Sequence, residues 1–279
     1  VMTATPIPRT LAMTAFGDMD SSILSEKPTG RRAIKTVAVP LSRIEDVISG
    51  IERAIKNGDK VYWICPLVEE SEEENPLADI AAAQARYIEF KARFGDIVAI
   101  AHGKMKAEER DNAMLGFAGD AYKILVATTV VEVGVDVPDA TIIIIEHAER
   151  FGLSQLHQLR GRVGRSDNES TCILLYKDKC NEIAKKRIKI IRESNDGFLI
   201  AEEDLKLRGS GDILGTLQSG MQNFHFADIA SHYELMNIAH NDVKLIMHND
   251  PELKSERGQA LRNMLYLFGY DESIRFIGG

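Results

Sequence analysis

Residues 158–165 read QLRGRVGR, a segment in which two glycines separate three arginines. The arginines are Arg160, Arg162 and Arg165. A guanidinium group stays ionised and offers a planar fork of donors that matches phosphate oxygens. Glycine lacks a Cβ, so a phosphate can approach the backbone closely between the charges. A basic loop after a short helix at 153–159 would explain isolated arginines, but this spacing favours contact with a phosphate.

The usual cradle for a nucleotide phosphate does not occur in these 279 residues. No GxxxxGK[ST] sequence is present, because Gly103 and Lys104 lack the earlier glycine and are followed by Met105. No DExH or DExD box is present either, and these two motifs supply the lysine and the Mg²⁺-binding acid of a nucleoside triphosphatase. We therefore expect the chain to be a piece of a longer protein that does not hydrolyse ATP alone.

A second group of residues suited to phosphate follows an apolar run. The sequence ATTVVEVGVDVP at 127–138 places Thr128 and Thr129 directly after that run. Small hydroxyl residues after a strand suit phosphate binding. A strand, a turn at Gly134 and a hairpin would explain the same residues.

A further candidate is AHGKM at 101–105, where the backbone at Gly103 can approach a phosphate. Its histidine, His102, is equally well explained as a hydrogen-bonded loop residue. No spacing typical of zinc ligands involves His102, His147 or His157.

The composition excludes several classes of protein. A hydrophobic content of 44% and a charged content of 27% are ordinary for a globular protein, and no apolar stretch is long enough to span a bilayer. The three cysteines form no CxxC, which favours reduced thiols and the cytosol over a disulfide framework. The net charge of −8 argues against a uniformly basic coat, but it permits a local basic face.

Six short apolar runs must position these candidate residues. They occupy 34–40, 61–68, 97–102, 123–128, 141–146 and 170–176. Runs that are apolar on both faces and alternate with helices predict a parallel sheet covered by helices on both sides. In the first of these helices, Ser42 with Glu45 predicts a capping box, and Gly58 predicts the C-terminal end. After Lys177 the pattern is mainly helical, with a break at Asp250–Pro251.

The order of these motifs resembles that of the superfamily 2 helicases. TATPIPRT at 3–10 resembles motif III, AHGKM lies in the fourth-motif region, ATTVVEVGVDVP resembles motif V and QLRGRVGR resembles motif VI. The resemblance implies an α/β, RecA-like second helicase lobe at 31–178. Residues 1–30 would then end the first lobe and form a linker, and 179–279 would form a helical C-terminal extension.

The resemblance also implies roles for individual residues. Those expected to act at ATP are the arginine-finger candidates Arg162 and Arg165, together with Gly134, Asp136 and Gln158. Those expected to contact nucleic acid are Gly103, Thr128 and Thr129. Those expected to couple the two sites are Thr3 and Thr5.

The sequence GFLIAEEDLKLRGSGDILGTLQSG at 197–220 resembles the translocation motif shared by the RecG family of branched-DNA helicases and the transcription-repair coupling factor. The resemblance implies that Arg208, Gly209 and Gly211 transmit motion. The LGTLQSG ending and the residues at 250–276 are similar to the RecG family, from which Ser210 departs, since proline or alanine is usual there.

The helix expected at 181–194 is strongly basic. Its cations are Lys185, Lys186, Arg187, Lys189 and Arg192, of which the first three are our DNA-binding candidates. For at least half of the five, we favour the alternative that they cover the core or pair with Glu182 and Glu193.

Together, the resemblances imply an ATP-dependent helicase that remodels stalled replication forks and Holliday junctions in recombination and repair. It would use ATP with Mg²⁺, whose ligands would lie in the missing first lobe, and would bind duplex and branched DNA. It would act as a monomer in the bacterial cytoplasm, at the nucleoid and not at a membrane. The alternatives are a fragment of a transcription-repair coupling translocase and a non-enzymatic regulatory module that lends its arginines to a partner.

Overall fold

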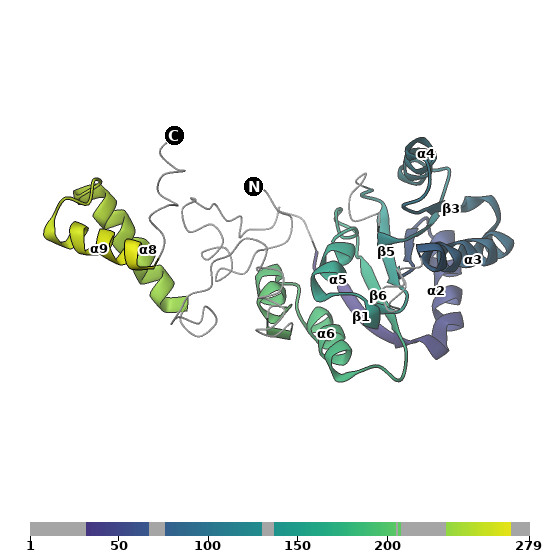
Figure 1. Ribbon diagram of the computed structural model, residues 1–279. Coiled ribbons are helices and arrows are strands. Elements are labelled where there is room, and N and C mark those ends of the chain that lie inside the picture. Colours follow the sequence, from purple (N-terminus) through teal and green to yellow (C-terminus); the bar gives the residue numbers. More distant parts are fainter. Residues whose placement is uncertain (1–31, 67–75, 130–136, 205, 208–232, 269–279) are drawn as a thin grey trace. The chain divides into compact units, whose positions relative to one another are not determined.

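The computed structural model describes residues 32–66, 76–129, 137–204, 206–207 and 233–268. The chain divides into two compact units. The described residues up to Leu207 belong to the first unit, and residues 233–268 belong to the second (Figure 1).

The first unit is built on one six-stranded sheet. Its strands are β1 (Lys35–Pro40), β2 (Lys60–Ile64), β3 (Val98–Ala101), β4 (Ile124–Ala127), β5 (Ala140–Ile145) and β6 (Thr171–Tyr176). Their spatial order is β1-β6-β5-β2-β4-β3, and each neighbouring pair is parallel. Every strand overlaps one of the six apolar runs, which confirms the predicted parallel α/β sheet.

Helices cover both faces of this sheet. They are α2 (Ile44–Lys56), α3 (Pro76–Phe94), α4 (Ala107–Ala118), α5 (Leu153–Arg160) and α6 (Glu182–Glu193). One buried cluster joins α2 and α3 to the sheet through residues that include Ile48 and Phe90. The other cluster joins α4, α5 and α6 through Phe117, Leu156 and Ile191. Figure 1 shows α2 and α3 on one side of the strands and α5 and α6 on the other.

The start of α2 differs from the predicted capping box, which is wrong. Leu41–Arg43 form a 3-10 turn, the helix begins at Ile44, and no side chain caps it. Ser42 lies inside that turn, and Arg43 donates to Asp46 at 2.8 Å. At the other end, Gly58 has a φ of 97°, a left-handed conformation that favours glycine and confirms the predicted end of the helix.

The second unit is helical in its described residues, and it consists of α8 (Tyr233–Asn249) and α9 (Glu256–Leu267). Asp250 builds the turn between them. The Ser255 hydroxyl and the backbone N–H groups of Lys254 and Ser255 donate to its carboxylate, and these bonds hold the pKa of Asp250 below its usual range. This turn confirms the predicted break after α8.

Candidate nucleotide and nucleic-acid sites

The segment QLRGRVGR begins on α5 and ends in the loop that leads to β6. Leu153, Leu156 and Leu159 are buried and fix the helix against the sheet. At the start of the helix, the Gln155 side chain accepts a hydrogen bond from the Gly152 N–H at 3.0 Å. Gln158, a predicted ATP-site residue, is half-buried on the same helix.

Arg160 belongs to the protein interior. Its side chain is 2% exposed, and its Nη1 donates to the carbonyls of Ile191 at 2.6 Å and Ser194 at 2.7 Å. These carbonyls lie at the C-terminal end of α6, where carbonyl groups lack partners within the helix. Burial lowers the pKa of Arg160. The prediction of a phosphate contact is therefore wrong for Arg160, which ties α5 to α6.

A sequence signal for this burial existed. Arg160 follows Leu156 by four residues and Leu153 by seven, and residues at this spacing share one face of a helix. The high charge of the motif favours exposure, and this spacing is the opposing signal.

Arg162 and Arg165 lie in the loop after α5, and both are half-buried. The Nε of Arg165 donates to the carbonyl of Gly161 at 3.1 Å. Gly164 has a φ of 73°, and a Cβ at that position would lie 2.8 Å from Cγ1 of Ile34. The loop therefore requires glycine at this position for both its conformation and its packing.

The DNA-binding candidates Gly103, Thr128 and Thr129 come together at the carboxyl ends of β3 and β4. The two strands pair up to Ala101 and Ala127, and the Thr128 N–H continues the pairing by donating to the Ala101 carbonyl at 3.3 Å. Gly103 is exposed, Thr129 is half-buried and Thr128 is buried. This is the edge at which open parallel sheets bind ligands.

His102 lies at the same edge and is 8% exposed. Its backbone makes the hydrogen bonds of a turn, because its carbonyl accepts from the Met105 N–H at 3.1 Å and its N–H donates to the Met105 Sδ at 3.4 Å. The ring Nδ1 has no hydrogen-bond partner. Burial lowers the pKa of His102.

The arginine loop and the threonine pair lie at opposite ends of the strands. Gly164 lies beside Ile34 and Ser170, the residues that immediately precede β1 and β6. Thr128, in contrast, immediately follows β4. Because all strands are parallel, the first group lies toward the amino edge of the sheet and the second at the carboxyl edge.

Helix α6 presents part of its basic face as predicted. Asn181 caps it by accepting a hydrogen bond from the Ala184 N–H at 2.7 Å, and its buried residues are Ala184, Ile188 and Ile191. Of the three DNA-binding candidates, Lys185 pairs with Glu182 at 2.8 Å, Lys186 is exposed and Arg187 is half-buried. Lys189 is exposed, and Arg192 lies 3.6 Å from Glu193. Pairing with glutamate thus describes Lys185 and Arg192, two of the five cations, which is fewer than the half expected.

Several predicted site residues lie outside the described residues. They are Thr3, Thr5, Gly134, Asp136, Arg208, Gly209, Ser210 and Gly211. Within the described part of the chain, no helix is long and apolar enough to cross a membrane. The same residues contain no group of three or more His, Cys, Asp or Glu side chains that could hold a metal ion.

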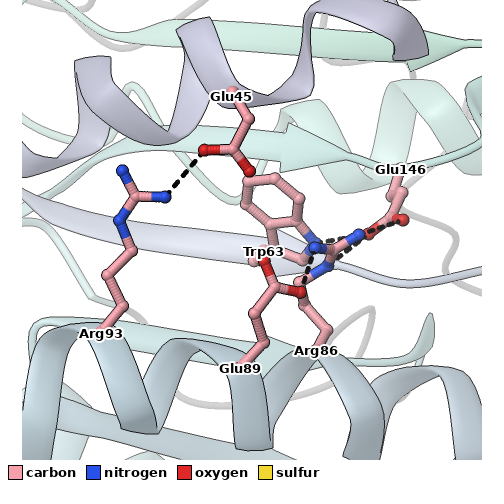
Figure 2. A network of polar contacts seen from close by, with 6 residues as sticks. All are labelled: Glu45, Trp63, Arg86, Glu89, Arg93 and Glu146. Carbon is pink, nitrogen blue, oxygen red and sulfur yellow. Dashed lines mark hydrogen bonds and ion pairs between the residues drawn. The ribbon is translucent and has the colours of Figure 1, made fainter.

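A buried polar network at the carboxyl edge was not predicted. Figure 2 shows Glu146, directly after β5, accepting hydrogen bonds from Trp63 Nε1 at 2.8 Å and from Arg86 Nη2 at 2.8 Å. Arg86 also pairs with Glu89 at 2.6 Å, so the network joins β2 and β5 to α3. Burial and the charge of Glu146 raise the pKa of the Cys65 thiol well above its usual range. The only sequence signal was the acidic residue that ends the run TIIIIE.

Comparisons with known proteins agree with this geometry. The model of the helicase conserved C-terminal domain matches residues 42–167, which include the sheet from α2 to the arginine loop. The model of the ATP-dependent DNA helicase RecG, domain 3, C-terminal, matches residues 194–266. The fold and these matches define the sheet and its covering helices as a RecA-like helicase C-terminal lobe.

Relatives with curated names identify the family. The chain is 49% identical to the ATP-dependent DNA helicase RecG of Escherichia coli (strain K12), over 82% of this chain and 33% of the relative. It is 44% identical to the protein of the same name from Bacillus subtilis (strain 168), over 96% of this chain and 39% of the relative. The chain belongs to the RecG family and spans about a third of the length of these relatives.

A solved structure agrees in fold. The structure of RecG bound to a three-way DNA junction matches with a TM-score of 0.66 and 39% identity, and the match covers 84% of this chain and 30% of that one.

Proposed function

We propose that this chain is the C-terminal part of an ATP-dependent helicase that remodels branched DNA, such as stalled replication forks and Holliday junctions, in recombination and repair. The observation that carries the proposal is the likeness to RecG bound to a three-way DNA junction, at 39% identity over 84% of this chain. The two family models match in the same order along the chain.

At the ATP site, Arg162 and Arg165 would stabilise the charge that spreads over the γ-phosphate oxygens during transfer. The structure fits this role for Arg165, because the hydrogen bond to Gly161 and the left-handed Gly164 fix the loop that carries it. Gln158, Gly134 and Asp136 would complete this lobe's share of the site. ATP would bind with Mg²⁺, which supplies charge neutralisation at the phosphates.

The remaining groups for ATP hydrolysis would come from a first lobe. The chain holds no GxxxxGK[ST] and no DExH box. Hydrolysis would then require the two lobes to close on each other, because the arginines and the phosphate cradle belong to different lobes. Alone, this chain would not hydrolyse ATP.

Arg160 would transmit the movement of lobe closure from α5 to α6. Its bonds to the Ile191 and Ser194 carbonyls make α6 follow α5, and α5 leads directly into the arginine loop. Movement of the loop would therefore reach the exposed lysines of α6 and the segment with Arg208, Gly209 and Gly211. Thr3 and Thr5, in motif III at the end of the first lobe, would link the ATP and DNA sites.

Duplex DNA would meet two surfaces of this unit. Gly103, Thr128 and Thr129 would contact a strand phosphate, and Lys186 would contribute charge from α6. Lys185 and Arg187 are weaker candidates, because Lys185 pairs with Glu182 and Arg187 is half-buried. The intact enzyme would act as a monomer in the bacterial cytoplasm, at the nucleoid.

The test is to measure ATP turnover and fork unwinding side by side in the full-length protein. The wild type should unwind a labelled fork only with ATP. Gly211→Pro should keep ATP turnover and lose unwinding, because the transmitting segment is changed and the ATP site is not. Gly50→Ala is the control, since a Cβ on Gly50 meets nothing within 4 Å.

Two results would contradict the proposal. A full-length wild type without ATP-dependent unwinding would remove the helicase function and favour the regulatory module. Loss of both activities in Gly211→Pro would contradict only the transmitting role of that segment, and the helicase function would stand.

A further inference from the structure

Two buried polar atoms at the carboxyl ends of β3 and β4 lack hydrogen-bond partners in the structure. They are Nδ1 of His102 and Oγ1 of Thr128, whose residues are 8% and 1% exposed. An unpaired buried polar group costs stability, and such groups are uncommon in folded proteins. Other buried side-chain atoms, such as Thr36 Oγ1 and Ser166 Oγ, also lack partners, but His102 and Thr128 follow paired strands at the edge where open parallel sheets bind ligands. This position points to a partner that joins when a ligand binds.

The sheet places these two residues at matching positions at the ends of neighbouring strands. Ala101 and Ala127 pair in parallel register, so His102 and Thr128 are the next residues on neighbouring strands. The Thr128 N–H still donates to the Ala101 carbonyl, which extends the pairing to this point. Residues in register on parallel strands direct their side chains to the same face of the sheet. The exposed Gly103 follows His102 directly.

We propose that His102 is a positioning residue for the Thr128 hydroxyl when nucleic acid is bound. In that state, the His102 Nδ1–H donates to Thr128 Oγ1, and the hydroxyl donates its own proton to a phosphate oxygen of the strand. The inference rests on the proposed function, in which Thr128 contacts a strand phosphate. The inference adds His102 as the group that orients the Thr128 hydroxyl.

The chemistry of the three groups suits this chain of hydrogen bonds. A hydroxyl both accepts and donates, whereas a phosphodiester oxygen only accepts. Burial lowers the pKa of His102, so its ring is neutral at physiological pH and donates from one nitrogen only. The bond from His102 to Thr128 polarises the hydroxyl and strengthens its bond to the phosphate. His102 Nδ1 and Thr128 Oγ1 therefore gain their partners in the same step.

The proposal predicts an unusual dependence on salt. A lysine that contacts a phosphate releases counterions, so removing it lowers both the DNA affinity and the slope of affinity against salt. A neutral His102–Thr128 pair releases none. Its loss should therefore weaken DNA binding and leave the salt slope unchanged.

The test uses the full-length protein and fluorescence anisotropy with a labelled forked duplex at several salt concentrations. Thr128→Val and His102→Gln should each weaken binding about tenfold, the usual worth of one hydrogen bond to a charged group. His102→Asn should stay within about twofold, because the asparagine amide can donate from the position of Nδ1 and the glutamine amide from that of Nε2. The double variant His102→Gln, Thr128→Val should bind no more weakly than Thr128→Val.

The outcomes separate this inference from the proposed function. Weak binding by Thr128→Val with normal binding by His102→Gln would overturn the inference and leave the phosphate contact in place, as would an additive double variant. Equal weakening by His102→Asn and His102→Gln would also overturn it. Normal binding by Thr128→Val would remove the phosphate contact itself. Lys186→Ala is the matched control and should lower the salt slope.

Discussion

Two groups of buried polar side chains, at opposite edges of the parallel sheet, differ in their hydrogen bonding. At the amino edge, Lys60 is 2% exposed, and its Nζ donates to the carbonyls of Ala118 and Gly119 at 3.0 and 2.5 Å. Beside it, the Thr141 hydroxyl donates to Asp59 at 2.6 Å. These buried polar groups all have protein partners.

At the carboxyl edge, His102 Nδ1 and Thr128 Oγ1 have none. The edge alone does not account for the difference, because Glu146 at the carboxyl edge is paired with Trp63 and Arg86, and the buried Oγ atoms of Thr36 and Ser166 have no partner. His102 and Thr128 stand apart because they lie on neighbouring strands at the edge where open parallel sheets bind ligands. We infer that Lys60 and Thr141 stabilise the fold through their partners, whereas His102 and Thr128 gain partners when a ligand binds.

Removal of the Lys60 charge should cause the largest loss of stability among the substitutions that test this comparison. Lys60→Met should lower the free energy of unfolding of this unit by about 3 kcal/mol, because two carbonyls at the end of α4 lose a charged donor. Native-state hydrogen exchange of β2 and α4 in the full-length protein would measure it. DNA affinity should not change. An unaltered exchange rate would show that the pairing at the amino edge does not stabilise the fold.

Thr141→Val tests the same edge by a smaller change. It leaves Asp59 without the hydroxyl donor and should cost about 1–2 kcal/mol in the same measurement. DNA affinity should again stay at the wild-type value. Weaker DNA binding by this variant would contradict the division of roles between the edges.

The free energy of unfolding should depend on pH through the buried His102. Burial lowers the pKa of His102 from its ordinary value of 6.5, so the folded state binds fewer protons than the unfolded state. This contribution to stability is complete above pH 6.5 and is lost as the pH falls through that value toward the folded pKa. His102→Asn should therefore lose less stability than the wild type between about pH 8 and about pH 5. Equal losses would show that His102 does not titrate with folding.

The smallest effect on stability is expected for Thr128→Val, which makes the same chemical change as Thr141→Val at the opposite edge. Its hydroxyl has no partner to lose, so the free energy of unfolding should stay within about 0.5 kcal/mol of the wild type. A loss as large as that of Thr141→Val would mean that Thr128 has a structural partner.

The fold could be predicted because its signals are repeated along the chain. The four isoleucines of TIIIIE, at 142–145, form an apolar run without alternation, and strands of this kind lie between layers of helices. The error at Ser42 was local, since a capping box and a 3-10 turn compete for the same few residues and differ little in energy.

The site was only partly predictable. Placement of Thr128 after a strand followed from the sequence, but the burial of Arg160 depends on carbonyls of α6 that lie more than thirty residues away. The Glu146–Arg86 bond spans 60 residues in the same way. The leucine spacing indicates that Arg160 faces the interior, but the partners that it and Glu146 find there are set by tertiary packing, which a local pattern does not encode.

The central claim is that this lobe completes an ATP site whose phosphate cradle lies on another lobe. The most direct test is ATP turnover by full-length Arg165→Ala with saturating forked DNA, compared with Arg93→Ala, whose guanidinium pairs with Glu45 and Glu52 on α2. The account predicts that Arg165→Ala lowers turnover by about 10³-fold or more while ATP and DNA still bind, and that Arg93→Ala does not. Turnover near the wild-type rate in Arg165→Ala would contradict it.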